Sequence, residues 1–232
     1  MPAGRFFIAA PLKNTLTLEG EEFHHLAKVM RLRIGETLEL VNGQGEFSEA
    51  ELISLDKKSC ELKILSHQKT PPPDQTLILA LALTRPASLE WTLEKATELG
   101  ATEFWLFPGE RSEKTELSPS QLHRLETILI NALKQCGRLY LPKIVLKPPL
   151  AKWEHPSGSL FFGDLSSHAP LLKGPFSNPV TFLIGPEKGF SPEETRLLRE
   201  KFKAHPISLH ENILRAETAA ITALSQFYLI KS

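Results

Sequence analysis

Residues 183–194 read LIGPEKGFSPEE, an apolar segment followed by a turn and by the signature of a helix start. The turn contains Gly185 and Gly189, and it leads into Ser191, a proline and Glu194. A serine N-cap, a proline at the first helical position and a glutamate three residues after the serine satisfy the capping-box pattern. The stretch therefore predicts a strand, a tight turn and a helix, which is the βα connection of an α/β sheet.

The same alternation of strand and helix extends in both directions from this stretch. Short apolar runs alternate with longer segments whose apolar residues have helical spacing, which indicates a mostly parallel sheet covered by helices. Strands are expected at 76–84, 103–108, 142–147, 159–164, 180–185 and 205–209. Helices are expected at 88–100, 118–138, 191–202 and 215–230.

The N-terminal part of the chain has a different pattern. Short β-rich runs at 5–11, 15–19, 36–41, 46–55 and 59–65 predict a small β-barrel or sandwich. A stiff connector, HQKTPPPDQ at 67–75, follows them, because three consecutive prolines exclude helix. We therefore expect a small β domain over residues 1–70 and an α/β domain over residues 71–232.

One helix is expected in the β domain, over residues 21–32. Helical spacing separates its apolar face from a basic face that carries Lys28 and Arg31 and is extended by Arg33. The basic face can bind RNA phosphates, although a solvated face is the commoner state of such a stripe. The apolar face is formed by Phe23, Ala27 and Met30.

Composition limits the classes of function. Among 232 residues, 41% are hydrophobic and 23% charged, which is ordinary for a folded globular protein. The 27 basic and 27 acidic side chains balance, so any nucleic-acid binding must depend on local patches. The two cysteines lack the spacing of a disulfide framework or zinc site, so we expect no metal. No apolar run is long enough to span a membrane and the start lacks a signal peptide's apolar region, so we expect a cytoplasmic protein.

The turn in 183–194 is a candidate binding site, because open α/β sheets bind ligands at the carboxyl ends of their strands. Neither the GxGxxG fingerprint nor the GxxxxGK[ST] phosphate loop occurs in the chain. Its glycines allow close approach, so backbone groups can contact a flat heterocycle. The alternative is a structural turn without a ligand.

A second candidate site lies in SLHENILRAETAAITAL, residues 208–224, where a strand passes through a short loop into an apolar helix. Such a helix is buried in the core or against another subunit. Arg215 and Glu217 stand at its start. Arg215 can pair with Glu217 or Glu211, or it can contact an anion or RNA.

These two stretches, in this order, resemble the RsmE family of ribosomal RNA uridine-N3 methyltransferases within the SPOUT superfamily. Further segments resemble the same family, including its first catalytic-domain helix, a loop arginine, a Gln-x-x-Arg stretch and the signature of its PUA-like barrel. In the same order, these four segments are EWTLEKATELGA at 90–101, ERS at 110–112, ALKQCGRLYLPKI at 132–144 and EEFHHLAKVMRLRIGE at 21–36.

The resemblance implies a parallel α/β domain with a deep C-terminal trefoil knot, a PUA-like barrel that docks RNA, a homodimer and S-adenosylmethionine as cofactor. The RNA is implied to belong to the small ribosomal subunit. The loop after residues 159–164 would be a third wall of the cofactor pocket. The residues implied to bind the cofactor are Leu183, Ile184, Gly185, Pro186, Glu187, Gly189, Leu209, Asn212, Ile213 and Leu214.

The reaction needs in-line attack by N3, removal of its proton, and a cation near the uracil carbonyls. Arg215 or Arg111 can supply this cation, and Glu217 can act as base or orient Arg215. Gln135 and Arg138, one helical turn apart, can hold RNA or a partner loop, or they can simply form a helix C-terminus with a favourable cation. Arg85 is expected to face the RNA.

The chain departs from the family pattern at several positions. Lys188 replaces a glycine of the family turn, and His210 and Asn212 replace a glycine and an arginine of the second loop. Arg85, Ser88 and Asn131 stand where the family often has lysine, lysine and glutamate. Two alternatives to the leading function remain: an RNA-binding ribosome-assembly protein with weak or no catalysis, and a SPOUT methyltransferase with another RNA target.

Overall fold

The computed structural model describes residues 4–166 and 168–231, which form two compact units. Unit 1 contains the described residues up to 73 together with 130–141, and unit 2 contains 74–129 and the described residues from 142. Two contacts explain why 130–141 belongs to unit 1. The hydroxyl of Tyr140 donates to the Thr70 carbonyl at 2.8 Å, and Lys134 forms an ion pair with Glu22. The predicted boundary near residue 70 assigns all later residues to the α/β domain, whereas the chain returns to unit 1 at residues 130–141.

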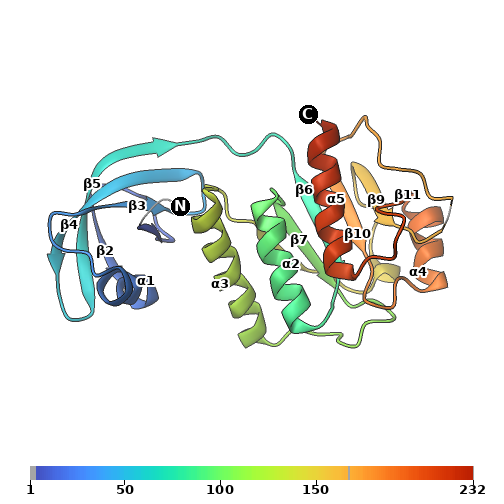
Figure 1. Ribbon diagram of the computed structural model, residues 1–232, viewed down its shortest axis with the longest axis horizontal. Helices are drawn as coiled ribbons and strands as arrows, with labels where there is room; N and C mark the ends of the chain where they lie inside the picture. Colours follow the sequence, from blue (N-terminus) through green and yellow to red (C-terminus); the bar gives the residue numbers. More distant parts are fainter. Residues whose placement is uncertain (1–3, 167, 232) are drawn as a thin grey trace. The chain divides into compact units, whose positions relative to one another are not determined.

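Unit 1 is a curled sheet of five strands in the order β1-β3-β4-β5-β2 (Figure 1). All neighbouring pairs are antiparallel except β1 and β3. The pairing of β4 with β5 shifts register twice, and such irregularities bend and twist a sheet. The strands are β1 (Arg5–Phe7), β2 (Thr15–Glu19), β3 (Thr37–Val41), β4 (Glu46–Leu55) and β5 (Ser59–Lys69).

The helix of unit 1 differs from the prediction. It begins as α1 (Gly20–His24) and continues as a π-helix, η1 (His25–Met30), whose turns are wider than those of an α-helix. Leu26 lies in the core of the curled sheet, and Met30, the last residue of η1, is 38% exposed, so the prediction that Met30 shares the buried apolar face with Phe23 and Ala27 is wrong.

The same π-helix changes the predicted basic face. It ends at Arg31, whose left-handed backbone, with φ of 55°, turns the chain away. Lys28, Arg31 and Arg33 are all exposed, but they do not form one helix face.

Unit 2 contains a six-stranded, fully parallel sheet, which confirms the predicted α/β class. Its strand order is β11-β9-β10-β6-β7-β8, so β10 lies between β9 and β6, two strands that precede it in the chain. The strands are β6 (Leu77–Ala82), β7 (Glu103–Phe107), β8 (Lys143–Leu146), β9 (Ser159–Gly163), β10 (Val180–Ile184) and β11 (His205–Ile207).

The helices follow the predicted segments closely. Helix α3 ends at Cys136, and Gly137 then adopts a φ of 83°, so Arg138 lies beyond the helix and does not share a helix face with Gln135. No helix in the described part of the chain is long and apolar enough to cross a membrane. The helices are α2 (Pro86–Glu98), α3 (Pro119–Cys136), η2 (Leu150–Lys152), α4 (Pro192–Arg196), η3 (Leu197–Lys201) and α5 (Ala216–Lys231).

Alternation along the buried strands fills two cores, one on each face of the sheet. Helix α5 covers one face of the sheet (Figure 1). On this face Phe182 of β10 packs against Phe227, with ring centroids 5.9 Å apart. On the opposite face, the neighbouring Leu183 belongs to a cluster with Trp153 and Phe202. The rigid sheet between these cores fixes the positions at which its strands end.

Candidate functional site

A cavity of about 600 Å³ opens at the carboxyl ends of β9, β10 and β11 in unit 2. Three connections line it, namely 163–166 after β9, 184–190 after β10 and 208–214 after β11, together with Ala216 and Ala219 of α5. The cavity thus lies where β10 separates β9 from β6, and the crevice at such a reversal of strand order is where open α/β sheets bind ligands.

The structure brings together nearly all the residues predicted to bind the cofactor. All of them line the cavity except Leu183, whose side chain is buried in the core. The predicted third wall, after residues 159–164, also lines it, as does Arg111. Arg215 and Glu217 do not line it, although Leu214 and Ala216 beside them do.

Other predicted residues lie elsewhere. Arg85 is in unit 2, where its backbone N–H donates to Glu187 of the cavity wall at 3.1 Å. The remaining predicted RNA-binding residues belong to unit 1 and not to the unit that contains the cavity: they are Lys28, Arg31, Arg33, Gln135 and Arg138.

The turn after β10 is tight because its backbone folds back on itself. A Cβ atom on Gly185 would lie 2.9 Å from the Phe190 nitrogen and 3.1 Å from the Gly189 carbonyl carbon. Gly189 has a φ of 68°, and its N–H donates to the Pro186 carbonyl at 2.8 Å. Lys188 has no such left-handed φ, so it replaces the family glycine without backbone strain. Close approach, rather than a positive φ, is therefore what requires glycine at position 185.

The connection after β11 is held at its start and exposed at its tip. Gln226 of α5 donates to the carbonyl of Leu209 at 2.9 Å, which anchors the loop to the helix. His210 Nδ1 accepts from the Asn212 N–H at 3.0 Å, so the two residues that depart from the family pattern contact each other. Ile213 at the tip is exposed. The loop thus presents a fixed base and an accessible apolar side chain.

Asp164, in the connection after β9, is a cavity residue that was not singled out from the sequence. One carboxylate oxygen accepts from the Ser166 N–H at 3.0 Å, and the other forms an ion pair with Arg199 of η3. The carboxylate therefore stabilises the third wall of the cavity. Its place at a strand end is the one available sequence signal.

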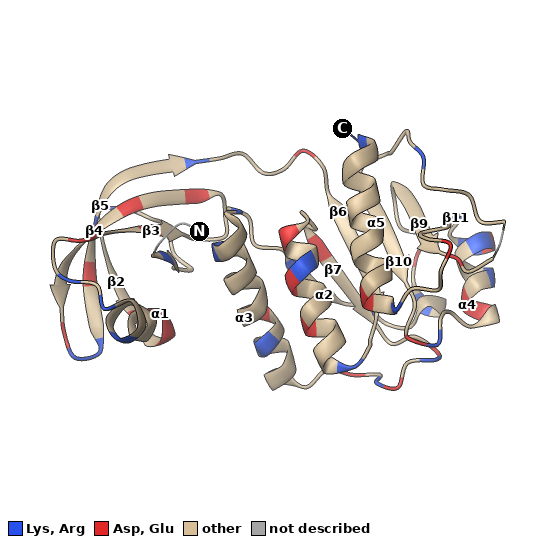
Figure 2. Ribbon diagram, in the orientation of Figure 1, with Lys and Arg blue, Asp and Glu red and all other residues tan. Residues whose placement is uncertain are grey.

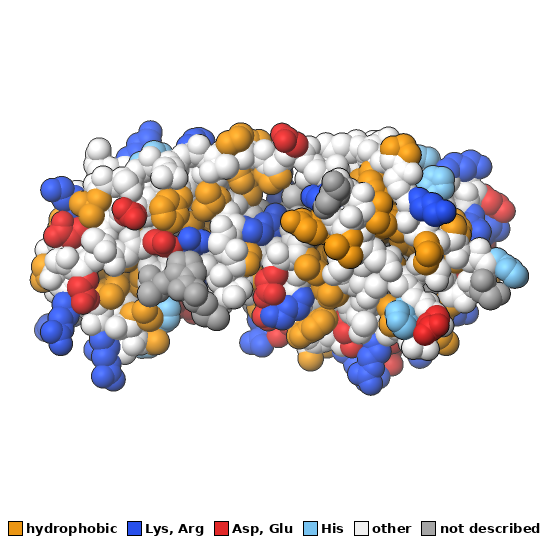
Figure 3. Space-filling view, turned by 45° about the horizontal axis from the view of Figure 1, so that its top comes forward, with side chains coloured by type: hydrophobic (Ala, Val, Ile, Leu, Met, Phe, Trp, Pro, Cys, Tyr) orange, Lys and Arg blue, Asp and Glu red, His pale blue; other side chains and the backbone are white. Residues whose placement is uncertain are grey.

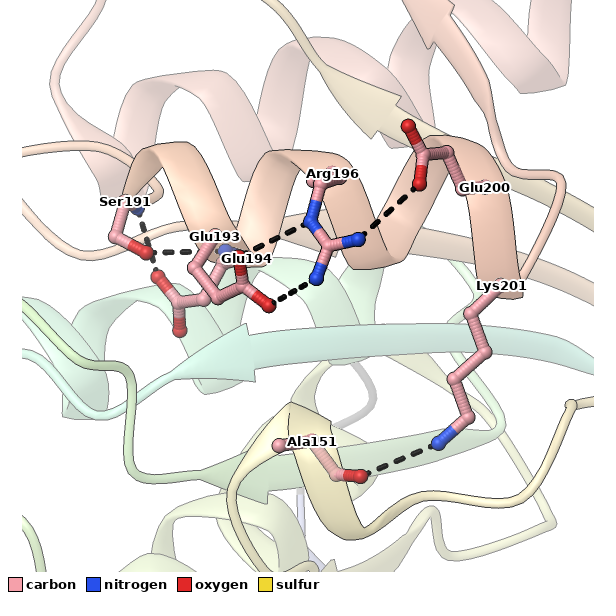
Figure 4. Close-up of polar contacts among 7 residues, drawn as sticks. All are labelled: Ala151, Ser191, Glu193, Glu194, Arg196, Glu200 and Lys201. Atoms are coloured by element: carbon pink, nitrogen blue, oxygen red, sulfur yellow. Dashed lines mark hydrogen bonds and ion pairs between the residues drawn. The ribbon is translucent and has the colours of Figure 1, made fainter.

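Glu194 joins two sides of the site, and Figure 4 shows its contact with Ser191 on one of them. The Ser191 hydroxyl accepts from the Glu194 N–H at 3.0 Å, and Glu194 Oε2 accepts from the Ser191 N–H at 2.9 Å, which confirms the predicted capping box. The other oxygen, Oε1, accepts from the Glu110 N–H at 3.0 Å. This buried carboxylate, only 2% exposed, therefore holds the loop after β7 against the turn after β10.

We expect Glu194→Gln to lower the free energy of unfolding by about 1–3 kcal/mol, because an amide NH₂ would face one of two buried N–H donors. Urea unfolding measures this effect. Glu193→Gln is the matched control, since Glu193 is exposed and pairs with Arg196 on the surface (Figure 4), and it should change stability by less than about 1 kcal/mol. Equal effects of the two substitutions would show that Glu194 is not a clamp.

The two arginines predicted to take part in catalysis, Arg111 and Arg215, differ in their contacts. Arg111 donates from Nη1 to the Lys188 carbonyl at 3.2 Å, which brings the predicted loop arginine to the turn. For Arg215, no ion pair exists within residues 4–166 and 168–231, so the predicted alternative of a pair with Glu211 or Glu217 is not observed there. Arg111 and Arg215 are both exposed.

Comparison with known proteins agrees with this geometry. Residues 71–228 match the family model of the RNA methyltransferase domain, and residues 18–65 match the model of the RNA methyltransferase PUA domain. Ribosomal RNA small subunit methyltransferase E of Rickettsia conorii is 29% identical over 100% of this chain and 98% of its own length. The protein of the same name from Mesomycoplasma hyopneumoniae is 30% identical over 96% of this chain and 97% of its own.

A solved structure extends the likeness to the fold. Ribosomal RNA small subunit methyltransferase E of Neisseria gonorrhoeae, crystallised with S-adenosylmethionine, superposes with a TM-score of 0.86 at 26% identity. The match covers 99% of this chain and 97% of that one. The chain therefore belongs to the RNA methyltransferase family that includes the ribosomal RNA small subunit methyltransferase E proteins, and its N-terminal part is a PUA domain of that family.

Proposed function

We propose that the protein transfers a methyl group from S-adenosylmethionine to N3 of a specific uridine in 16S ribosomal RNA of the small subunit. The observation that carries this proposal is the cavity at the ends of β9, β10 and β11, lined by the connections to which the family resemblance assigns the cofactor. The names of the similar proteins support the choice of RNA. We place the reaction in the cytoplasm, where a bacterial small subunit is found.

The residues present fit S-adenosylmethionine. A volume of about 600 Å³ lies within the usual range of roughly 300–1,000 Å³ for small-molecule sites. Gly185 and Gly163 keep side-chain bulk out of a tightly packed wall, since added Cβ atoms would lie 2.9 Å from the Phe190 nitrogen and 3.3 Å from a Leu209 methyl group. The three exposed or partly exposed acids of the lining, Asp164, Glu187 and Glu211, suit the cofactor's positive charge.

Bound S-adenosylmethionine supplies an activated methyl group. The chain must then orient the uracil for in-line attack, accept the N3 proton and stabilise the negative charge that develops on the uracil carbonyls. Arg111 is the strongest candidate for the stabilising cation, because it alone of the two proposed arginines lines the cavity. Glu217, half-buried in the first turn of α5, is the candidate base or orienting group for Arg215.

RNA docking is assigned to unit 1. Lys28, Arg31 and Arg33 are exposed around the end of the π-helix, where their charges can reach phosphates without a regular helix face. Gln135 is exposed and Arg138 is half-buried in the segment that joins this unit. Burial lowers the pKa of the Arg138 guanidinium. The match to the PUA model supports this role.

The knot and the homodimer implied by the resemblance are also part of this proposal. The position of β10 between two earlier strands is compatible with threading of the C-terminal part. Much of α5 is buried within the protomer, including Leu224 and Phe227, but Tyr228, Leu229 and Ile230 are exposed at its end. Figure 2 shows few charges along this helix between its ends, and Figure 3 shows hydrophobic side chains gathered in the same part of unit 2.

We expect light scattering to give twice the 26.0 kDa chain mass at micromolar concentration, because a dimer would cover these apolar residues. Leu229 is 76% exposed and makes the best probe, since Leu229→Arg should shift the mass toward the monomer without disturbing the core. A wild-type mass of 26.0 kDa would contradict the dimer.

Calorimetric titration with S-adenosylmethionine tests the enzymatic assignment. We expect binding at one site per chain. A folded protein that does not bind the cofactor would favour the non-catalytic RNA-binding alternative.

A further inference from the structure

A second hollow lies beside the cavity and shares two residues with it. Glu110, Arg111, Ser112, Glu113 and Lys188 line this hollow, and Arg111 and Lys188 also line the cavity. The hollow therefore adjoins the cavity mouth at the turn after β10. RNA that delivers a base into the cavity must bring the neighbouring backbone close to this rim.

Glu113 is held at this rim by a forked contact. Arg85 Nε and Nη2 lie 3.3 Å and 3.4 Å from the two Glu113 carboxylate oxygens. These distances are long, and the side chains of Arg85 and Glu113 are 69% and 53% exposed, so the pair contributes little to stability. A competing anion can therefore displace Glu113 at small cost.

Lys188 is the second cation near Glu113. The pKa of Glu113 lies below its ordinary value, first because Arg85 donates hydrogen bonds to it and finally because of the Lys188 charge. Within the described residues Lys188 makes no ion pair closer than 4 Å. Glu113 and Lys188 line the same hollow, and a guanidinium fork with an ammonium nearby is a combination that also binds phosphate oxygens.

The charges at the rim balance in the free protein. Three cations, Arg85, Arg111 and Lys188, lie with three carboxylates, Glu110, Glu113 and Glu187, and the Glu187 carboxylate accepts the backbone N–H of Arg85. A balanced rim does not attract RNA from a distance. It becomes a phosphate site only when Glu113 moves away, which makes Glu113 a competitor of the RNA.

We propose that Arg85 and Lys188 form a subsite for one phosphodiester group of the RNA substrate and that Glu113 occupies this subsite in the free protein. The proposal rests on the RNA methyltransferase function proposed above. Lys188 lines both the hollow and the cavity, so a phosphate bound to it lies directly at the cavity mouth. Glu113 leaves the fork when the phosphate arrives and then faces solvent.

The test is the affinity for purified small ribosomal subunits, measured by filter binding between about 50 and 200 mM salt. Glu113→Gln should tighten binding about three- to tenfold because it removes the competitor. Lys188→Gln should weaken binding by a similar factor and reduce the slope of log K against log salt by about one.

A double variant separates competition from a general effect of charge. In an Arg85→Gln background, Glu113→Gln should give no gain if Glu113 competes for the Arg85 fork, whereas a general loss of negative charge would give the same gain in both backgrounds. Glu110→Gln, at an exposed acid of the same hollow, is the matched control and should have a smaller effect.

The outcomes distinguish the two proposals. If the wild-type protein binds small subunits, and Glu113→Gln and Lys188→Gln bind them with the same affinity, the subsite is overturned and the proposed function stays intact. An equal gain from Glu113→Gln with and without Arg85 would also overturn it. A wild-type protein that does not bind small subunits would overturn both the subsite and the function.

Discussion

Gly185→Val is expected to abolish S-adenosylmethionine binding, with a loss of about a hundredfold or more in affinity, while the protein stays folded. The added Cβ would lie 2.9 Å from the Phe190 nitrogen, a backbone atom that cannot move without opening the turn. The branched Cβ of valine also carries two methyl groups, which need space on the same crowded wall. A hundredfold loss corresponds to about 2.7 kcal/mol, which is within reach of a displaced loop and a partly filled cavity.

Calorimetry of the purified variant measures this loss, and circular dichroism with urea unfolding establishes that the variant is folded. Lys188→Gly is the matched substitution in the same turn. It removes a side chain from the turn, whereas Gly185→Val adds one, and position 188 has no backbone strain. Lys188→Gly should therefore preserve or improve cofactor affinity. Normal affinity in folded Gly185→Val would mean that residues 183–194 form a structural turn and that any cofactor binds elsewhere.

The second large effect is expected from Arg111→Ala, which should lower the rate of methyl transfer about 100- to 1,000-fold at saturating RNA and cofactor. Losing a preorganised donor to a developing oxyanion has effects of this size. Arg111 lines the cavity, and its Nη1 donates to the Lys188 carbonyl, so its guanidinium is held at the mouth. Cofactor affinity should change less than threefold, because the backbone of the turn is proposed to hold the cofactor.

Single-turnover kinetics on small ribosomal subunits gives the rate, and calorimetry gives the affinity. Arg124→Ala is the control, since Arg124 is an exposed arginine of the same unit that pairs with Glu90 away from the cavity. A rate within threefold of the wild type in Arg111→Ala would remove this residue from the chemistry and leave Arg215 as the candidate cation.

Local sequence signals predicted much of unit 2. The capping box at Ser191 and Glu194 is a pattern of four residues, and the buried strands are continuous apolar runs, so both are visible without the fold. The two stretches that resemble the family also contain most of the cavity lining. The strand, turn and helix predictions succeeded because each depends on neighbours in sequence.

Features that depend on distant residues could not be predicted in this way. The second role of Glu194 is a contact with Glu110, 84 residues away in sequence, and no local pattern marks it. The place of β10 between β9 and β6 is likewise a property of the whole sheet.

The prediction of a regular helix over residues 21–32 of unit 1 failed for another reason. A regular α-helix through residue 32 would put Met30 on the apolar face, whereas the helix is a π-helix from His25 and ends at Met30, which is exposed, and the tertiary packing of the curled sheet decides which turn is adopted.

The central claim is that the cavity in unit 2 serves methylation of N3 of one uridine in 16S ribosomal RNA. The most direct measurement incubates small ribosomal subunits that lack this modification with the protein and S-adenosylmethionine, and then maps the methylated nucleoside by mass spectrometry. The account predicts 3-methyluridine at a single position, formed by the wild-type protein and not by folded Gly185→Val. A methyl group on another base atom or on a ribose, or no transfer by a protein that binds the cofactor, would contradict it.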